Sequence, residues 1–188
     1  MIADKLIVGV SGMPGSGKSV VVNVAKNQGF DIIIMGDIVR EETERRRLLL
    51  SPKNMGKVML DLRSTGGKDI IAKKCIPKIK EKNTKKIIID GLRSLHELDL
   101  FKKHFSEFNL IAVHSSPETR YSRLNQRGRS DDSKERKVFE ERDLRELTVG
   151  LGQVIAMADF MLINEDNIEE LKRKSNEILQ RIEKKWMK

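Results

Sequence analysis

Short, almost continuous apolar runs recur along the chain, and each ends in or is followed by glycine, serine, aspartate or asparagine. Runs of this length, rich in isoleucine, valine and leucine, predict β-strands. Because both faces of such strands are apolar, they are typical of a parallel sheet that is covered on both sides. The predicted strands are Lys5–Val10, Asp31–Met35, Lys86–Asp90, Asn109–His114 and Asp159–Ile163.

Stretches with helical character separate these runs. The predicted helices are Ser19–Gln28, Glu41–Leu50, Ser94–Phe105, Glu118–Gln126, Ser133–Met157 and Ile168–Trp186. In the last of them, apolar residues recur at helical spacing and form one apolar face on an otherwise charged helix. The regular alternation of strands and helices predicts an α/β fold with a parallel sheet.

Length and composition favour one folded domain over residues 1–188, which is long enough to bury a real core. The single cysteine, Cys75, cannot form an internal disulfide, and no secretory signal pattern is found, so we expect a cytoplasmic protein. No apolar run approaches the roughly 18 residues of a membrane-spanning helix, and we expect no membrane partner. A net charge of +9 favours polyanionic partners, which are nucleic acid, an acidic membrane surface or a phosphate-rich small molecule.

One glycine-rich stretch carries a phosphate-binding pattern. The residues Gly12, Met13, Pro14, Gly15, Ser16, Gly17, Lys18 and Ser19 match G-x-x-x-x-G-K-[ST] at every fixed position, between a predicted strand and a predicted helix. Glycines let backbone N–H groups face a phosphate, and the helix N-terminus adds partial positive charge. We therefore expect this loop to bind ATP, with Lys18 neutralising the β- and γ-phosphates and Ser19 offering its hydroxyl to Mg²⁺.

Polar residues also follow two other predicted strands. Asp37 and Arg40 come after the second strand, and Asp90, Gly91 and Arg93 end or follow the third. Ligands of open parallel sheets bind at this carboxyl edge. An aspartate at the end of such a strand is suited to support Mg²⁺, which assigns that role to Asp90. Helix N-capping is the structural alternative for both aspartates.

An arginine-rich segment over residues 118–132 is predicted to form a lid. Arg120, Arg123 and Arg127 are spaced i, i+3, i+7 and share one helix face, where they would repel one another without an anion. Arg142 and Arg145, one turn apart on a later predicted helix, are expected to reach the same site. Such a segment suits closure over a triphosphate and stabilisation of charge on the transferring phosphoryl group. The alternative is a solvated face paired with neighbouring acidic residues.

In this order, the four motifs resemble those of adenylate kinase and related nucleoside monophosphate kinases across most of the chain. The segment Val154–Leu171 is more similar to the end of dephospho-coenzyme A kinase. Taken whole, the sequence most resembles archaeal proteins described as adenylate-kinase-related or dephospho-coenzyme-A-kinase-like. The resemblance implies a P-loop NTPase fold with a five-stranded parallel sheet in the order 2-3-1-4-5. It also implies two helical excursions, one that binds the acceptor over residues 40–83 and the lid over residues 118–132.

The resemblance extends to residue roles. It implies that Arg40 and Arg93 grip the phosphate of the acceptor. The expected acceptor-binding residues are Asp37, Arg40, Gly91, Arg93 and Arg142. The expected catalytic residues are Lys18, Arg123, Arg127 and Asp37, and Arg120 is expected to join the P-loop in holding ATP. Transfer to a nucleoside monophosphate is thus the favoured reaction.

Two alternatives stay open. A hydroxyl acceptor, as in dephospho-coenzyme A kinase, needs its proton removed, and Asp37 is the carboxylate expected to accept it. A nucleic-acid-bound ATPase or nucleotide switch would use Arg45–Arg47 and the C-terminal lysines on the phosphate backbone. That second alternative is less favoured, because few aromatic residues are present for base stacking and no known nucleic-acid-binding pattern is found.

Overall fold

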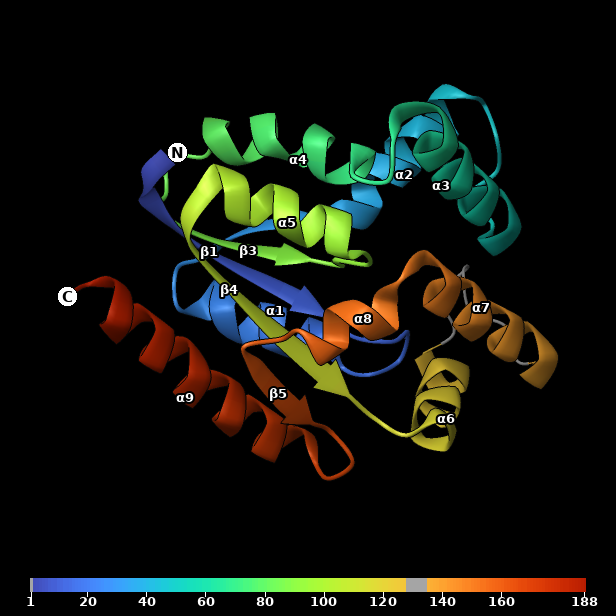
Figure 1. Ribbon diagram of the computed structural model, residues 1–188. Coiled ribbons are helices and arrows are strands. Elements are labelled where there is room, and N and C mark those ends of the chain that lie inside the picture. Colours follow the sequence, from blue (N-terminus) through green and yellow to red (C-terminus); the bar gives the residue numbers. More distant parts are fainter. Residues whose placement is uncertain (1, 128–134) are drawn as a thin grey trace.

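The computed structural model describes residues 2–127 and 135–188. Over these residues the chain forms one parallel sheet of five strands in the order β2-β3-β1-β4-β5, which confirms the predicted order (Figure 1). The strands are β1 (Ile2–Ser11), β2 (Asp31–Ile34), β3 (Lys86–Asp90), β4 (Phe105–His114) and β5 (Phe160–Ile163). In the register, Asp90 lies opposite both Val10 of β1 and Ile34 of β2, so three strand ends meet at this carboxylate.

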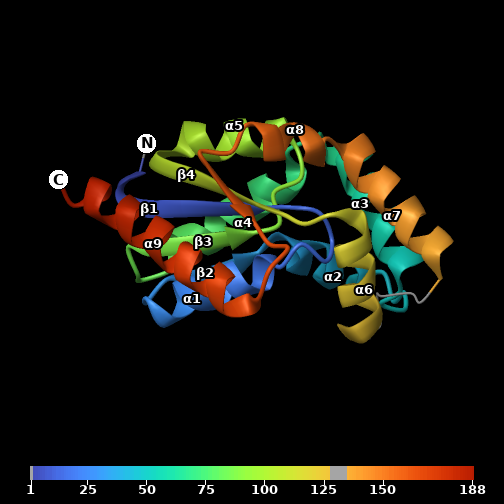
Figure 2. The same cartoon turned by 90° about the horizontal axis from the view of Figure 1, so that it is seen from below.

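Helices cover both faces of the sheet. One face is covered by α1 (Lys18–Asn27) and α9 (Ile168–Trp186), and the other by α4 (Ile70–Glu81), α5 (Leu95–His104) and α8 (Leu151–Ala156) (Figures 1 and 2). Four further helices lie toward the carboxyl ends of the strands (Figure 1): α2 (Met35–Arg45), α3 (Pro52–Gly66), α6 (Pro117–Arg127) and α7 (Arg136–Val149). These four enclose the end of the sheet at which ligands of parallel sheets bind.

The core has two apolar layers because successive residues of a strand point to opposite faces. Ile87 and Ile89 belong to the layer under α4 and α5, whereas Ile88 belongs to the layer under α1 and α9. All three side chains are fully buried. The near-continuous apolar runs therefore fill both layers, as the sequence predicts.

Several element boundaries differ from the prediction. The second strand ends at Ile34, and the helix expected over Glu41–Leu50 instead starts at the buried Met35 and ends at Arg45. The helix expected over Ser133–Met157 is divided into α7 and α8 at Gly150, whose φ of 113° is a left-handed conformation that glycine adopts without strain. Residues 128–132 of the predicted lid lie outside the described residues.

The predicted acceptor-binding excursion, residues 40–83, contains the second half of α2 together with α3 and α4. Serine at position 51 caps α3, because its side chain accepts a hydrogen bond from the backbone N–H of Asn54. Among the described residues, no helix combines the length and the apolar character needed to cross a bilayer.

Candidate functional site

The predicted P-loop connects the carboxyl end of β1 to the first turn of α1. Gly17 has a φ of 103°, and a Cβ at this position would lie 2.3 Å from Nδ2 of Asn164. A Cβ on Gly12 would lie 2.3 Å from the carbonyl oxygen of Val113. Side chains are therefore excluded at both positions, which lets the loop pack closely against Val113 and Asn164.

Lys18 begins α1, and its ammonium group lies against the loop. Its Nζ donates to the carbonyl oxygens of Gly12, at 2.7 Å, and Met13, at 3.3 Å. Burial lowers the pKa of Lys18 to about 8, and the negative charge of Asp90 opposes this shift. A bound phosphate would act in the same direction as Asp90 and favour the protonated ammonium.

Ser115 and Asn164, two residues that the sequence analysis missed, hold the loop in place through hydrogen bonds. Nδ2 of Asn164 donates to the carbonyl oxygen of Ser16 at 2.8 Å, and Oγ of Ser115 donates to the carbonyl oxygen of Asn164 at 2.6 Å. Arg123 joins them, since its Nη1 donates to Oγ of Ser115 at 2.9 Å and to the carbonyl oxygen of Asn164 at 3.0 Å. Both missed residues follow the carboxyl ends of strands, a position that singled out Asp37 and Asp90 and applies equally to them.

Arg120 is buried, unlike Arg123 and Arg127. It is only 3% exposed, and its guanidinium forms a two-pronged ion pair with the carboxylate of Asp143 on α7. It also donates to the carbonyl oxygens of Pro14, at 3.1 Å, and Ser115, at 3.2 Å. The expectation that Arg120 holds the triphosphate is not met by this geometry, because the pairing with Asp143 occupies its guanidinium. Arg120 instead ties α6 and α7 to the P-loop.

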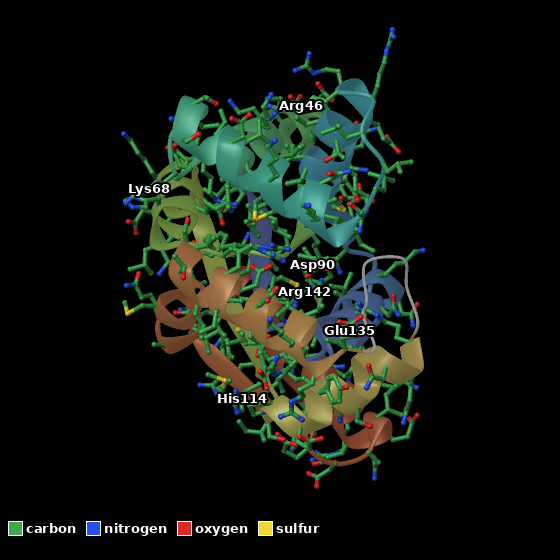
Figure 3. All side chains as sticks on the ribbon, turned by 90° about the vertical axis from the view of Figure 1, so that its right-hand side faces the viewer. Arg46, Lys68, Asp90, His114, Glu135 and Arg142 are labelled. Atoms are coloured by element: carbon green, nitrogen blue, oxygen red, sulfur yellow. The ribbon has the colours of Figure 1, made fainter. Side chains whose placement is uncertain are left out.

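A cavity of about 360 Å³ opens above the loop, and we call it the P-loop cavity. Most of the predicted site residues line it: Gly12, Pro14, Gly15, Gly17, Lys18, Ser19, Arg40, Asp90, Gly91, Arg93, Arg123, Arg127 and Arg142. Met13 and Ser16 belong to the loop, but their side chains are buried and do not line the cavity. Figure 3 looks onto this end of the molecule, with Asp90 and Arg142 near its centre.

Asp90 and Ser19 suit a divalent cation. Both line the P-loop cavity, and Oδ1 of Asp90 is buried without a hydrogen-bond partner among the described residues. A buried carboxylate oxygen without a partner is costly. Carboxylate and hydroxyl oxygens are ligands that Mg²⁺ prefers, so this pair fits the cation that the P-loop pattern implies.

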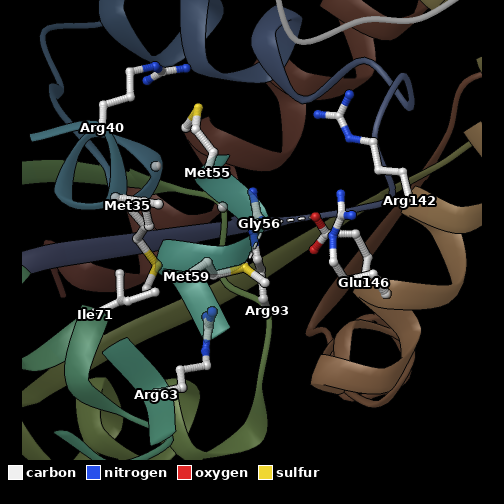
Figure 4. Close-up of a pocket in the computed structure, with 14 residues that line it drawn as sticks. Met35, Arg40, Met55, Gly56, Met59, Arg63, Ile71, Arg93, Arg142 and Glu146 are labelled. Carbon is white, nitrogen blue, oxygen red and sulfur yellow. Dashed lines mark hydrogen bonds and ion pairs between the residues drawn. The ribbon is translucent and has the colours of Figure 1, made fainter. Parts of the chain in front are cut away.

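A second cavity, of about 100 Å³, lies between the P-loop cavity and helices α2, α3, α4 and α7. We call it the arginine cavity (Figure 4), because arginine is the commonest residue in its lining. Its charged lining residues are Arg40, Arg63, Arg93, Arg142, Arg145 and Glu146. With five arginines and one carboxylate in the lining, this cavity favours an anion.

Six residues line both cavities, and we call them the shared wall: Gly36, Arg40, Gly91, Arg93, Arg142 and Glu146. Four of the five expected acceptor-binding residues are thus brought together at one place. The exception is Asp37, which lines neither cavity and forms an ion pair with Arg40 at a half-exposed position.

Glu146 is the carboxylate of the shared wall, and the sequence analysis missed it. It is 3% exposed, and its Oε1 accepts a hydrogen bond from Nη1 of Arg93 at 2.7 Å (Figure 4). It lies four residues after Arg142 on α7, so the helical spacing of the two residues was the signal available in the sequence. No comparable signal pointed to Arg63, whereas Arg145, one turn after Arg142, was expected at the site and lines the arginine cavity.

Comparisons with known proteins agree with this architecture. Residues 11–138 match the AAA domain family. The UPF0200 protein MJ1399 of Methanocaldococcus jannaschii is 46% identical over 179 residues, which cover 94% of this chain and 90% of the relative. Two solved structures share the fold at low sequence identity. A shikimate kinase from Bacteroides thetaiotaomicron has a TM-score of 0.62 and 13% identity, covering 93% of this chain and 98% of its own. A gluconokinase from Sinorhizobium meliloti has a TM-score of 0.56 and 13% identity, covering 96% and 94%.

Proposed function

This chain belongs to the AAA domain family and to the UPF0200 proteins, and we propose that it is an ATP-dependent phosphotransferase that acts on a small anionic acceptor. The solved structures that share its fold include two kinases of small molecules, which supports phosphoryl transfer. The resemblance to adenylate kinase is part of the proposal and concerns the identity of the acceptor.

The shared wall carries this proposal. A phosphotransferase must hold a donor and an acceptor on either side of one phosphorus atom, close together and shielded from water. Here the P-loop cavity and the arginine cavity have six lining residues in common. Three of these are arginines, so positive charge is concentrated where negative charge would gather on a transferring phosphoryl group.

Roles follow from position. The P-loop backbone and Lys18 would hold the β- and γ-phosphates of ATP, and Arg123 and Arg127 would face them from α6. Ser19 and Asp90 would hold Mg²⁺, which neutralises phosphate charge when it is bound. Arg40, Arg93 and Arg142 would orient the acceptor. Within a single domain over residues 1–188, residues 40–83 would serve as the acceptor-binding excursion and residues 118–132 as the lid.

The resemblance favours a nucleoside monophosphate as the acceptor, with a hydroxyl acceptor such as dephospho-coenzyme A as the alternative. A phosphate acceptor needs cations and no base, whereas a hydroxyl acceptor needs a carboxylate. The ion pair between Asp37 and Arg40 makes Asp37 a weaker candidate for that base than the sequence suggested.

The proposal is tested by incubating the protein with Mg-ATP and a panel of acceptors, then following ADP formation. The panel contains the four common nucleoside monophosphates, dephospho-coenzyme A and small hydroxy acids, with water alone as the reference. We expect one acceptor class to raise the rate of ADP formation well above the water rate. Equal rates with every acceptor and with water would contradict phosphotransfer and favour a slow ATPase or switch.

A further inference from the structure

The two ends of the arginine cavity differ in chemistry. One end is the shared wall, and the other, which we call the far end, has no part in the P-loop cavity. Apolar residues dominate the far end, and two arginines interrupt them. The residues that line only the arginine cavity are Met35, Val39, Met55, Gly56, Met59, Arg63, Ile71 and Arg145.

Arg63 of α3 is buried at the far end. Its side chain is 8% exposed, and its Nη2 donates to Oε1 of Glu97 at 2.5 Å. Its Nε and Nη1 are buried and have no hydrogen-bond partner among the described residues. The other oxygen of Glu97 is already used, since it accepts from the backbone N–H groups of Arg93 and Ser94. Two donors of a buried cation therefore remain unsatisfied, which is costly unless a ligand supplies oxygen atoms.

Arg145 of α7 is the second arginine that lines only the arginine cavity. It approaches α3 closely, because a Cβ on Gly56 would lie 3.3 Å from Cζ of Arg145. Within residues 2–127 and 135–188, Arg145 forms no ion pair. The residues that line only the arginine cavity thus include two guanidinium groups and no carboxylate among the described residues, and Glu97, which pairs with Arg63, lies outside this lining.

At the shared wall, the unsatisfied atom is a hydrogen-bond acceptor and not a donor. Oε1 of Glu146 accepts from Arg93, whereas Oε2 is buried and has no partner in the described part of the chain. A phosphate acceptor placed at this wall would meet the three arginines but would also face this carboxylate oxygen. A hydroxyl acceptor would instead donate a hydrogen bond to it, and like charges would not meet.

From these two observations we infer that the acceptor is a small hydroxyl-bearing anion whose hydroxyl lies against Glu146 and whose carboxylate or phosphate lies against Arg63 and Arg145. The inference rests on the proposed function. It reverses the orientation that a nucleoside monophosphate kinase would need, in which the phosphate lies at the shared wall and an uncharged base at the far end.

The proposed transfer needs only ATP and the acceptor as reactants. The hydroxyl oxygen forms a bond to the γ-phosphorus of ATP as the bond from that phosphorus to the β-phosphate oxygen breaks. The hydroxyl proton passes to Glu146, which later releases it to water, and the products are a phosphate ester and ADP. Glu146 is therefore a catalytic residue in this scheme, and Arg63 and Arg145 are binding residues.

The linkage of the product tests the inference. The protein is incubated with Mg-ATP and D-glycerate, glycerol 3-phosphate, dephospho-coenzyme A or a nucleoside monophosphate, and phosphorus NMR identifies the product. We expect a phosphate ester, and comparison of D-glycerate with the phosphorylated compounds separates a carboxylate from a phosphate at the far end. A phosphoanhydride would overturn the inference and leave the proposed function standing. No ADP with any acceptor would overturn both.

Variants test the role of each residue through kcat and KM, which are measured with the acceptor that reacts fastest. Glu146→Gln keeps an oxygen for Arg93 but cannot take a proton, so we expect kcat to fall about 10²- to 10⁴-fold with little change in KM. Arg145→Gln should raise the KM of the acceptor about 10- to 100-fold with little change in kcat, because a charged hydrogen bond to the substrate is lost. Exposed residues on α7 and α9 provide matched controls, Glu141→Gln and Arg173→Gln.

Arg63→Gln should resemble Arg145→Gln, and Arg63→Lys should restore part of the affinity. Because Arg63 is buried against Glu97, its variants are compared only if they fold, and Arg145→Gln decides the question if they do not. Unchanged KM in the Arg145 variant, or unchanged kcat in the Glu146 variant, would remove that residue from the acceptor site and overturn the assignment.

Discussion

Replacing Arg120 with methionine removes one partner of the buried ion pair between α6 and α7. Methionine has a similar length and keeps contact with apolar neighbours, so the change chiefly removes charge and hydrogen bonds. The side chains of Arg120 and Asp143 are 4% and 15% exposed, and the substitution leaves Asp143 without its cation. We expect a large loss of stability and no selective loss of ATP binding.

The magnitude follows from burial. Breaking a buried ion pair on one side costs about 3–5 kcal/mol, because a charge remains unpaired away from water. For a chain of this length, each kcal/mol lowers Tm by about 2–4 °C, which gives a fall of roughly 6–20 °C. Loss of the hydrogen bonds from Arg120 to Pro14 and Ser115 acts in the same direction.

Thermal unfolding of Arg120→Met, Asp143→Asn and the double variant measures this interaction. The two single variants should lose similar stability, and the double variant should lose much less than their sum, since the two residues act as one unit. Arg173→Met, at an exposed position on α9, is the matched control and should leave Tm nearly unchanged. A fall below about 1 kcal/mol in Arg120→Met would refute the structural role. Loss of ATP-analogue affinity in Arg120→Met but not in Asp143→Asn would show that Arg120 binds the nucleotide, as the sequence predicted.

Three further changes test the P-loop cavity. Lys18→Ala should abolish phosphoryl transfer while far-ultraviolet circular dichroism stays unchanged, and undiminished ADP formation would contradict the kinase proposal. Gly17→Ala combines a left-handed φ with a 2.3 Å approach to Asn164, so denaturant titration should show a loss of at least about 1–3 kcal/mol; wild-type stability would refute the geometry of the loop. Asp90→Asn should raise the Mg²⁺ concentration needed for half-maximal ADP formation, and an unchanged Mg²⁺ dependence would exclude Asp90 as a cation ligand.

Much of the fold could be predicted from the sequence, because the patterns that indicate strands and turns span only a few neighbouring residues. The apolar runs gave the strands, and the P-loop pattern identified the turn between β1 and α1. The strand order came from the resemblance and was confirmed. The break at Gly150 was missed, since a glycine within a long helical pattern reveals its φ only when packing fixes it.

The site residues could be predicted from the sequence where polar residues follow the end of a predicted strand. Arg40, Gly91 and Arg93 lie on the shared wall for that reason. Charge pairing was not readable, because Arg120 and Asp143 are 23 positions apart and belong to helices whose approach depends on tertiary packing. For the same reason, the pairing of Glu146 with Arg93, 53 positions away, could not be predicted.

The fate of the γ-phosphate tests the central claim most directly. Phosphorus NMR of one sample that contains the protein, Mg-ATP and an excess of acceptor follows every phosphorus atom at once. The account predicts that ATP is lost and that ADP and one phosphorylated organic product appear in equal amounts, with far slower loss when the acceptor is omitted. Release of inorganic phosphate in place of that product, at a rate independent of the acceptor, would contradict transfer across the shared wall.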